Sequence, residues 1–217
     1  MNRFPTKVRK NVFDRYILPY LATARRGYVS KVSLHHIFNY ILQRVKNGCA
    51  WRSLVIDSQH RKHLSWQTVY RHYRKWCLAG CFKRVWQALT DSIKIDTSVL
   101  SLDGTHTAAR FGGENVHYQG RKKAKTTNDL MLTTTSGFVL YVFSSESGNH
   151  HDGFQLTAKM RKAFTALRER GYKLTGRFLN ADSGFDTKAL RKMCHNRGVR
   201  PNIKLNPRNR KRTQGRK

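Results

Sequence analysis

The chain has 217 residues, with 43 Lys or Arg against 12 Asp or Glu and a formal net charge of +31. Hydrophobic residues make up 39% and aromatic residues 11%, enough to fill a core, which excludes a wholly disordered chain. The charge excess is more than solubility requires and predicts a polyanionic partner, foremost nucleic acid. Charge alone does not separate an enzyme acting on DNA from a basic RNA-binding protein of ribosomal type.

The N-terminal segment has no apolar core of signal-peptide length, and no run of 18 apolar residues occurs in the sequence. We therefore expect a cytoplasmic protein that associates with the nucleoid.

Residues 1–96 predict a helical domain. A short helix is expected around Phe13–Leu21. Amphipathic spacing from Leu34 to Val45, closed by Asn47-Gly48, predicts a second helix. Ser65 is a suitable cap for a third helix, and residues 81–93 predict a fourth.

The helix after Ser65 has an apolar stripe that includes Val69 and Trp76, with polar and basic residues mostly off that stripe. Several short helices of this kind are typical of a helix-turn-helix DNA-binding domain. A plain helical bundle with a solvated charged face is the alternative. On the first interpretation, the DNA-binding residues of this helix are Gln67, Arg71, Arg74 and Lys75.

From residue 97 the pattern becomes mixed. Residues 98–108, 127–137 and 138–147 predict strands, and Ser136-Gly137 predicts a hairpin turn. The remaining segments, in chain order, are a helix near 152–171, a strand in 176–186, a helix at 186–198 and a strand at 199–205. The order β-β-β-α-β-α-β predicts a mixed α/β domain over residues 97–217.

Two aspartates follow apolar strands directly and precede glycines, in "SLDGT" (Asp103) and "NADSG" (Asp182). If the first and fourth strands are neighbours, the two carboxylates converge at one sheet edge. Such a pair suits one or two divalent cations, and two metals can clamp the oxygens of a phosphodiester. Alternatively, each aspartate only caps its own turn.

Other polar residues near these strands have plainer interpretations. Asp152 and Asp186 are expected to cap helices. His150 and His151 lie in a loop, where either could contact a scissile phosphate or make a structural hydrogen bond.

The motifs "DGTHTAARFGG", "YQGRKKAKTTNDLMLTTTSGFVL", "GNHHD" and "LNADSGFD" resemble the DDE transposases of bacterial insertion sequences, specifically family five of that series. The segments "WRSL", "SWQTVYRHYRKW" and "GCFKRVWQAL" resemble the N-terminal region of that family. The resemblance implies an RNase H-like catalytic domain after a helix-turn-helix-like domain. It also implies double-stranded DNA as partner, both inverted-repeat ends and target, with cleavage and strand transfer as the activity.

Carried over by position, Asp103 resembles the first catalytic aspartate and Asp182 the second, both ligands of a two-metal Mg²⁺ (or Mn²⁺) site. His151 is placed at a scissile phosphate, and a homodimer on DNA is expected by resemblance. The basic segment of this region would contact DNA phosphates. The alternative is that it is a flexible, solvated charged loop. Its candidate DNA-binding residues are Arg110, Arg121, Lys122, Lys123 and Lys125.

The sequence departs from the family in one respect. The family's third acid is a glutamate on a helix after the fifth strand, whereas no Asp or Glu follows Asp186 here. Three explanations stay open: a decayed copy, a first reading frame completed by frameshifting, or replacement of the third acid by Glu146 or Asp152. The alternative function is a truncated, non-catalytic product that binds DNA and regulates or inhibits transposition.

Overall fold

The computed structural model describes residues 7–23, 30–109, 113 and 115–206. The chain divides into two compact units, Met1–Ile93 and Lys94–Lys217, a boundary three residues before the predicted one. The two units are described separately. No helix in the described ranges is long and apolar enough to cross a membrane.

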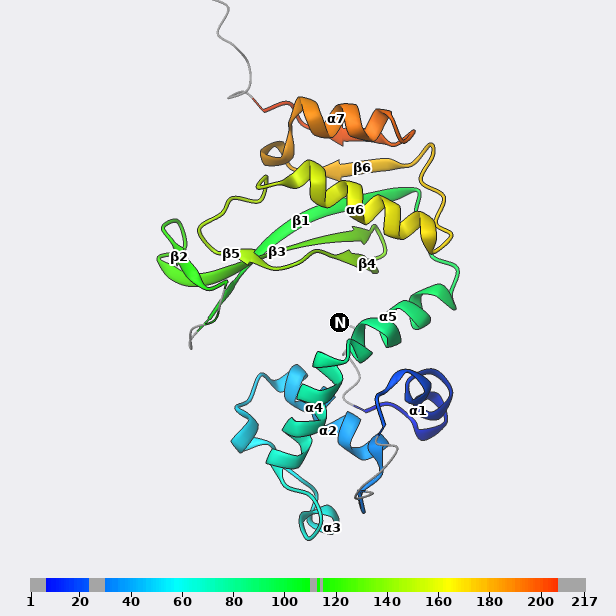
Figure 1. Ribbon diagram of the computed structural model, residues 1–217, viewed down its shortest axis with the longest axis vertical. Coiled ribbons are helices and arrows are strands. Elements are labelled where there is room, and N and C mark those ends of the chain that lie inside the picture. The colour runs from blue at the N-terminus through cyan, green and yellow to red at the C-terminus, as the bar shows by residue number, and fades with distance from the viewer. Residues whose placement is uncertain (1–6, 24–29, 110–112, 114, 207–217) are drawn as a thin grey trace, which may run out of the picture. The chain divides into compact units, whose positions relative to one another are not determined.

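The regular elements of unit 1, among the residues that the structure describes, are all helical (Figure 1). Gly48, in the left-handed region at φ +63°, ends the second helix as its sequence predicts, and the Ser65 hydroxyl accepts the Thr68 N–H to start the fourth. The helices and 3₁₀ turns are α1 (Lys10–Tyr16), η1 (Leu18–Tyr20), α2 (Leu34–Asn47), η2 (Trp51–Ser53), α3 (Ser58–Arg61), α4 (Trp66–Leu78) and α5 (Cys81–Asp91).

Two features of unit 1 differ from the prediction. The single helix expected around residues 13–21 is two elements, α1 and η1. Pro19, which has no N–H to continue an α-helical ladder, lies in η1. The single turns η2 and α3 were not predicted because elements this short carry no amphipathic period.

The core of unit 1 is built around α4. Val69 and Trp76 are fully buried, and the Trp76 indole N–H donates to the Ala22 carbonyl at 3.2 Å. Phe38 and Phe82 pack their rings near Trp76. The apolar stripe of α4 therefore faces the core, which leaves its basic side in solvent.

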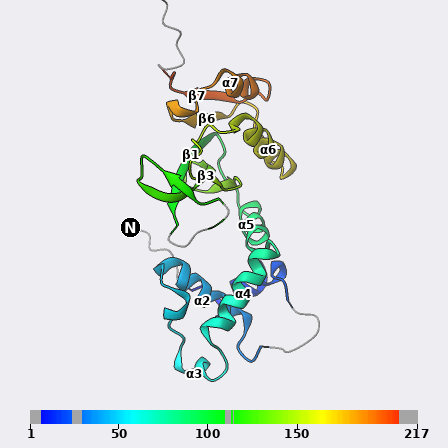
Figure 2. The ribbon, with the colours of Figure 1, turned by 60° about the vertical axis from the view of Figure 1, so that its left-hand side comes forward.

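Unit 2 is a mixed α/β unit with one sheet in the order β2-β3-β1-β6-β7, and β4 and β5 also pair with β3 (Figures 1 and 2). β1 pairs with β3 antiparallel, whereas β1 with β6 and β6 with β7 are parallel. The strands are β1 (Val99–Ala108), β2 (His117–Gln119), β3 (Ala124–Thr134), β4 (Val139–Val142), β5 (Glu146–Ser147), β6 (Phe178–Ala181) and β7 (Arg200–Ile203).

The helical elements of unit 2 are α6 (Leu156–Glu169), η3 (Ser183–Phe185) and α7 (Lys188–His195). The predicted strand order was wrong in lacking β2 and β5. β2 has three residues and β5 has two, and their sequences are mostly polar. They are strands because they pair with β3, since their own sequences show no strand pattern.

The core of unit 2 lies on the face of the sheet that α6 and α7 cover. Leu102 and Leu132 point to this face and pack in one cluster with Phe164 and Leu190 from the two helices. Burying each such side chain stabilises the fold by about 1.5–3 kcal/mol. Because side chains alternate along a strand, Asp103 points to the opposite face.

Neither aspartate predicted to cap a helix does so. α6 begins four residues after Asp152, which instead accepts a hydrogen bond from the Asn128 amide at 2.8 Å. The Thr187 hydroxyl caps α7, while Asp186 pairs with Arg191 at 2.7 Å. The carboxylate of Asp152 is thus held by a residue distant in the sequence, and that of Asp186 by a residue about one helical turn further on.

Candidate active site

Asp103 lies on β1, and Asp182 directly follows the neighbouring parallel strand β6. In that pair Ser101 is opposite Asn180, so each aspartate follows the last paired position by two residues. Neighbouring strands are about 4.8 Å apart. Asp103 lies, by alternation, on the face opposite the helices, since Leu102 beside it is buried on the helix side. The first and fourth predicted strands are thus neighbours, as the site requires.

Each of these carboxylates also accepts a backbone N–H close to it in the sequence. Asp103 Oδ1 accepts the Gly104 N–H at 2.8 Å, and Asp182 Oδ1 accepts the Gly184 N–H at 2.8 Å. The turn-capping interpretation is therefore correct for one oxygen of Asp182, whereas Asp103 and Gly104 both lie within β1. Within the described ranges the second oxygen of each carboxylate has no hydrogen-bond donor, so it is open to a cation.

A third carboxylate approaches β1 from the other face. A Cβ on Gly104 would lie 3.0 Å from both Cγ and Oδ1 of Asp152, and 2.9 Å from Leu130 Cδ2. The loop between β5 and α6 thus brings Asp152 against the backbone next to Asp103, on the helix side. Glu146, the other suggested substitute for the third acid, pairs with Lys159 at 3.1 Å.

Asp129 was missed by the sequence reasoning. It is opposite Thr105 in the pairing of β1 with β3 and lies on the same face as Asp103. Its carboxylate accepts hydrogen bonds from the hydroxyls of Ser145, Thr107 and Thr127. Three hydroxyl donors indicate a structural tie between strands. Asp129 occupies a position of the predicted strand whose side chain points away from the apolar face. That position could have singled it out in the sequence.

The basic segment forms a hairpin tip between β2 and β3 in the part that the structure describes. The Lys122 N–H donates to the Gln119 carbonyl, and Lys123 adopts φ +47°. The side chains of Arg121, Lys122 and Lys123 are exposed at this tip. Lys125 is exposed on β3, and Arg110 lies outside the described residues. Residues 119–123 thus form a turn with two backbone hydrogen bonds, and its basic side chains are exposed to solvent.

A pocket of about 410 Å³ connects this hairpin to β1. Its walls include Arg121 and Lys122 from the tip, His106 from β1, and His151 and Asp152 from the loop before α6. The structure therefore brings three of the predicted DNA-binding residues together beside the strand that carries Asp103.

The four predicted residues of α4 belong to unit 1. All four are exposed, on the side of the helix away from Val69 and Trp76. Burial and nearby Lys75 lower the pKa of His72, which packs against Trp76 and so stays neutral at pH 7. α4 thus presents one polar, basic face, formed by Gln67, Arg71, Arg74 and Lys75.

The donor set fits magnesium. Among the described residues no group of three or more His, Cys, Asp or Glu has a geometry that could hold a metal ion. Mg²⁺ is commonly bound through one or two carboxylates, with water and substrate phosphate oxygens completing its shell. The open oxygens of Asp103 and Asp182 meet that requirement.

Residues 15–86 match the family model described as "Putative transposase of IS4/5 family". The match covers about a third of the chain, includes α4, and ends before Asp103. Residues 15–86 are therefore similar to a family of putative transposases. No curated protein matches the chain.

Several solved structures are similar at low identity. The Mos1 transposase paired-end complex with left transposon end is 10% identical, with TM-score 0.35, over 82% of this chain and 61% of that one. The Drosophila P element transposase strand transfer complex is 16% identical, with TM-score 0.34, over 88% and 41%. The simian T-cell lymphotropic virus intasome with PP2A regulatory subunit B56 gamma is 15% identical, with TM-score 0.32, over 50% and 32%. The chain spans less than two thirds of each of these proteins.

Proposed function

We propose that the protein is a DNA transposase that cleaves and joins phosphodiesters at the Asp103–Asp182 edge of an RNase H-like unit 2. The observation that carries the proposal is the parallel pairing of β1 with β6, in which Ser101 is opposite Asn180, each two residues before one of the aspartates. The net charge of +31 and the transposase family match of residues 15–86 support it.

In this proposal Asp103 and Asp182 hold Mg²⁺ or Mn²⁺, which when bound neutralises the phosphate charge and makes water a better nucleophile. Arg121 and Lys122 at the hairpin tip, with Lys123 and Lys125, hold DNA phosphates beside the cut. His151, in the wall of the same pocket, donates to a phosphate oxygen.

The exposed face of α4 is proposed to recognise inverted-repeat ends, as the second helix of a helix-turn-helix does. Gln67 suits adenine and Arg71 or Arg74 suits guanine in the major groove, while Lys75 suits a phosphate. A homodimer on DNA and a cytoplasmic, nucleoid-associated location stay predictions.

The test is Mg²⁺-dependent nicking of duplexes that carry the genomic DNA flanking the gene on either side. The wild-type chain is expected to nick one or both flanks, whereas Asp103→Asn and Asp182→Asn are expected to abolish nicking and keep duplex binding. Asp96→Asn is the matched control, because Asp96 also accepts a backbone N–H but precedes β1 at the opposite end from the site. Nicking that survives Asp103→Asn would refute the catalytic assignment.

Two other outcomes separate the alternatives. Tight, end-specific duplex binding without nicking by the wild type would favour the non-catalytic regulator. Equal binding of RNA and of any DNA, unaffected by changes at Arg71 and Arg74, would favour a general RNA-binding protein and overturn the proposal.

A further inference from the structure

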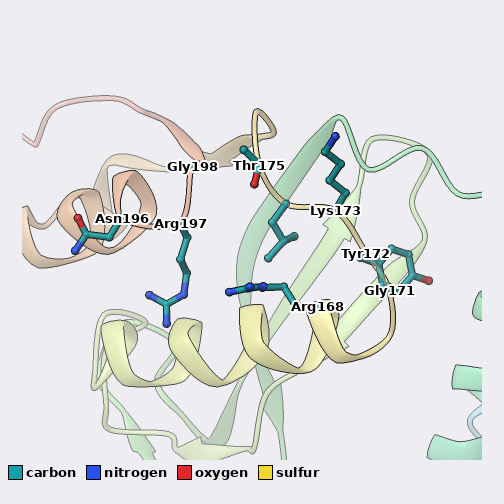
Figure 3. A pocket seen from close by; sticks show the side chains of 9 residues that line it. Arg168, Gly171, Tyr172, Lys173, Thr175, Asn196, Arg197 and Gly198 are labelled. Atoms are coloured by element: carbon teal, nitrogen blue, oxygen red, sulfur yellow. The ribbon is translucent and has the colours of Figure 1, made fainter.

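A second basic feature of unit 2 lies at the other end of the sheet. A pocket of about 460 Å³, here called the cationic pocket, forms where α6 and α7 end and where the chain enters β6 and β7 (Figure 3). Arg168 comes from the last turn of α6, Lys173 from the connection to β6, and Arg197 from the turn after α7. Three segments distant in sequence therefore each contribute one cation.

The charges of the cationic pocket are uncompensated in the described parts of the chain. No carboxylate lines the pocket, and Arg168, Lys173 and Arg197 make no ion pair there. Two other cations of unit 2 do have acidic partners: Arg191 pairs with Asp186, and Lys159 pairs with Glu146. Like charges around one hollow repel each other, and an anion in the pocket relieves that repulsion.

The backbone that frames the cationic pocket is fixed before any ligand binds. The Gly176 N–H donates to the Gly198 carbonyl at 2.7 Å, and Arg177 Nε donates to the Lys173 carbonyl at 3.2 Å. Gly198 adopts φ +69°, and a Cβ there would lie 2.9 Å from Thr175 Cγ2. The three cationic residues are thus attached to a backbone that is already ordered. Less backbone entropy is therefore lost when a ligand binds.

Helix dipoles explain only part of this arrangement. Cations near a helix C-terminus are favourable, which suits Arg168 after α6 and Arg197 after α7. Lys173 lies on neither helix, although it lines the same pocket. Helix dipoles alone therefore do not explain why Lys173 lies at this pocket.

We propose that the cationic pocket binds phosphodiester oxygens of DNA, as a second backbone contact away from the Asp103–Asp182 edge. The proposal rests on the proposed function. Seven residues separate Thr175, at the pocket, from Asp182, which spans at most about 23–25 Å of extended chain. At about 3.4 Å per base pair, roughly 7 bp of duplex cover that distance, so the separation is within the length of one bound duplex.

The test measures the salt dependence of binding to a 30-bp duplex by fluorescence anisotropy. Arg168→Ala/Arg197→Ala is expected to bind severalfold more weakly at 0.1 M salt. It should also lower the slope of log Kobs against log [salt] by about 2. The matched control is Arg161→Ala/Lys192→Ala, which removes the same charge from exposed positions on α6 and α7 outside the pocket. Lys173→Ala, on a connection rather than a helix, should lower the slope by about 1 even if the double variant fails to fold.

Equal losses in the pocket and control pairs would overturn the inference, because general charge would then explain the binding. An unchanged slope in Lys173→Ala would overturn it too. A wild-type chain that binds no duplex at 0.1 M salt would remove the proposed function along with the inference. Normal duplex binding with no effect of the pocket variants would remove the inference alone.

Discussion

Gly104→Ala tests the packing between β1 and Asp152. The added Cβ would lie 2.9 Å from Leu130 Cδ2 and 3.0 Å from Asp152 Cγ and Oδ1, closer than carbon atoms normally approach. Such overpacking costs about 1–3 kcal/mol. Alanine also restricts the unfolded chain, which stabilises by about 0.4–1 kcal/mol at a position without positive φ. The clash outweighs this gain, so we expect a net loss of about 1–2 kcal/mol.

The assay uses the position of the tryptophans. All four, Trp51, Trp66, Trp76 and Trp86, belong to unit 1. Indole fluorescence therefore follows unit 1, while circular dichroism follows both units. In urea, Gly104→Ala should lower the midpoint of the dichroism component of unit 2 and leave the fluorescence transition unchanged.

Two variants give this experiment its controls. Gly120→Ala adds the same methyl group at a position with no atom within 4 Å, so it should leave the stability of unit 2 unchanged or slightly raised. In an Asp152→Ala background, Gly104→Ala should cost about 0.5–2 kcal/mol less than in the wild type, because one source of the clash is gone. A Gly104→Ala protein as stable as the wild type, or a cost unaffected by Asp152→Ala, would refute the reasoning.

Three further predictions concern unit 2. The Asn206 N–H and Arg191 hold the pKa of Asp186 below its usual value, so its stabilising effect is complete above the unfolded pKa near 3.9 and is lost as pH falls through the folded pKa. Asp186→Asn should therefore lower the urea midpoint at pH 7 and flatten its decline below about pH 4. Thr187→Ala removes the cap of α7 and should cost about 0.5–2 kcal/mol in the same unfolding measurement; no loss would contradict the capping role. Burial raises the pKa of Cys194 to about 11, so iodoacetamide at pH 8 should label exposed Cys77 and spare Cys194, as read by peptide mass spectrometry. Equal native labelling of the two thiols would contradict that burial.

Sequence patterns predicted the elements whose signals are local. Gly48 ends α2 and Ser65 starts α4 because capping depends on residues within one turn. The adjacency of the strands before Asp103 and Asp182 was a condition of the expected site rather than a prediction, and β1 and β6 do pair.

The errors arose where tertiary partners decide. Asp152 had the chemistry of a helix cap, but Asn128 on β3 binds its carboxylate, and α6 starts at Leu156 instead. β2 and β5 form because β3 provides backbone hydrogen-bond partners for them. Segments of three and two residues are too short to show an alternating pattern in the sequence. The cationic pocket escaped notice because its three cations come from segments that only the fold brings together.

The parallel pairing of β1 with β6 also bears on how the candidate active site forms in time. About 80 residues separate Asp103 from Asp182, so closing this contact carries a larger entropy cost than the β3–β4 hairpin does. At synthesis rates of about 5–20 residues per second, Asp103 leaves the ribosome about 4–16 s before Asp182. During that interval β1 and β3 can pair while the candidate metal-binding edge does not yet exist. On the proposed function, a nascent chain would therefore bind DNA through its basic surfaces before it can cut.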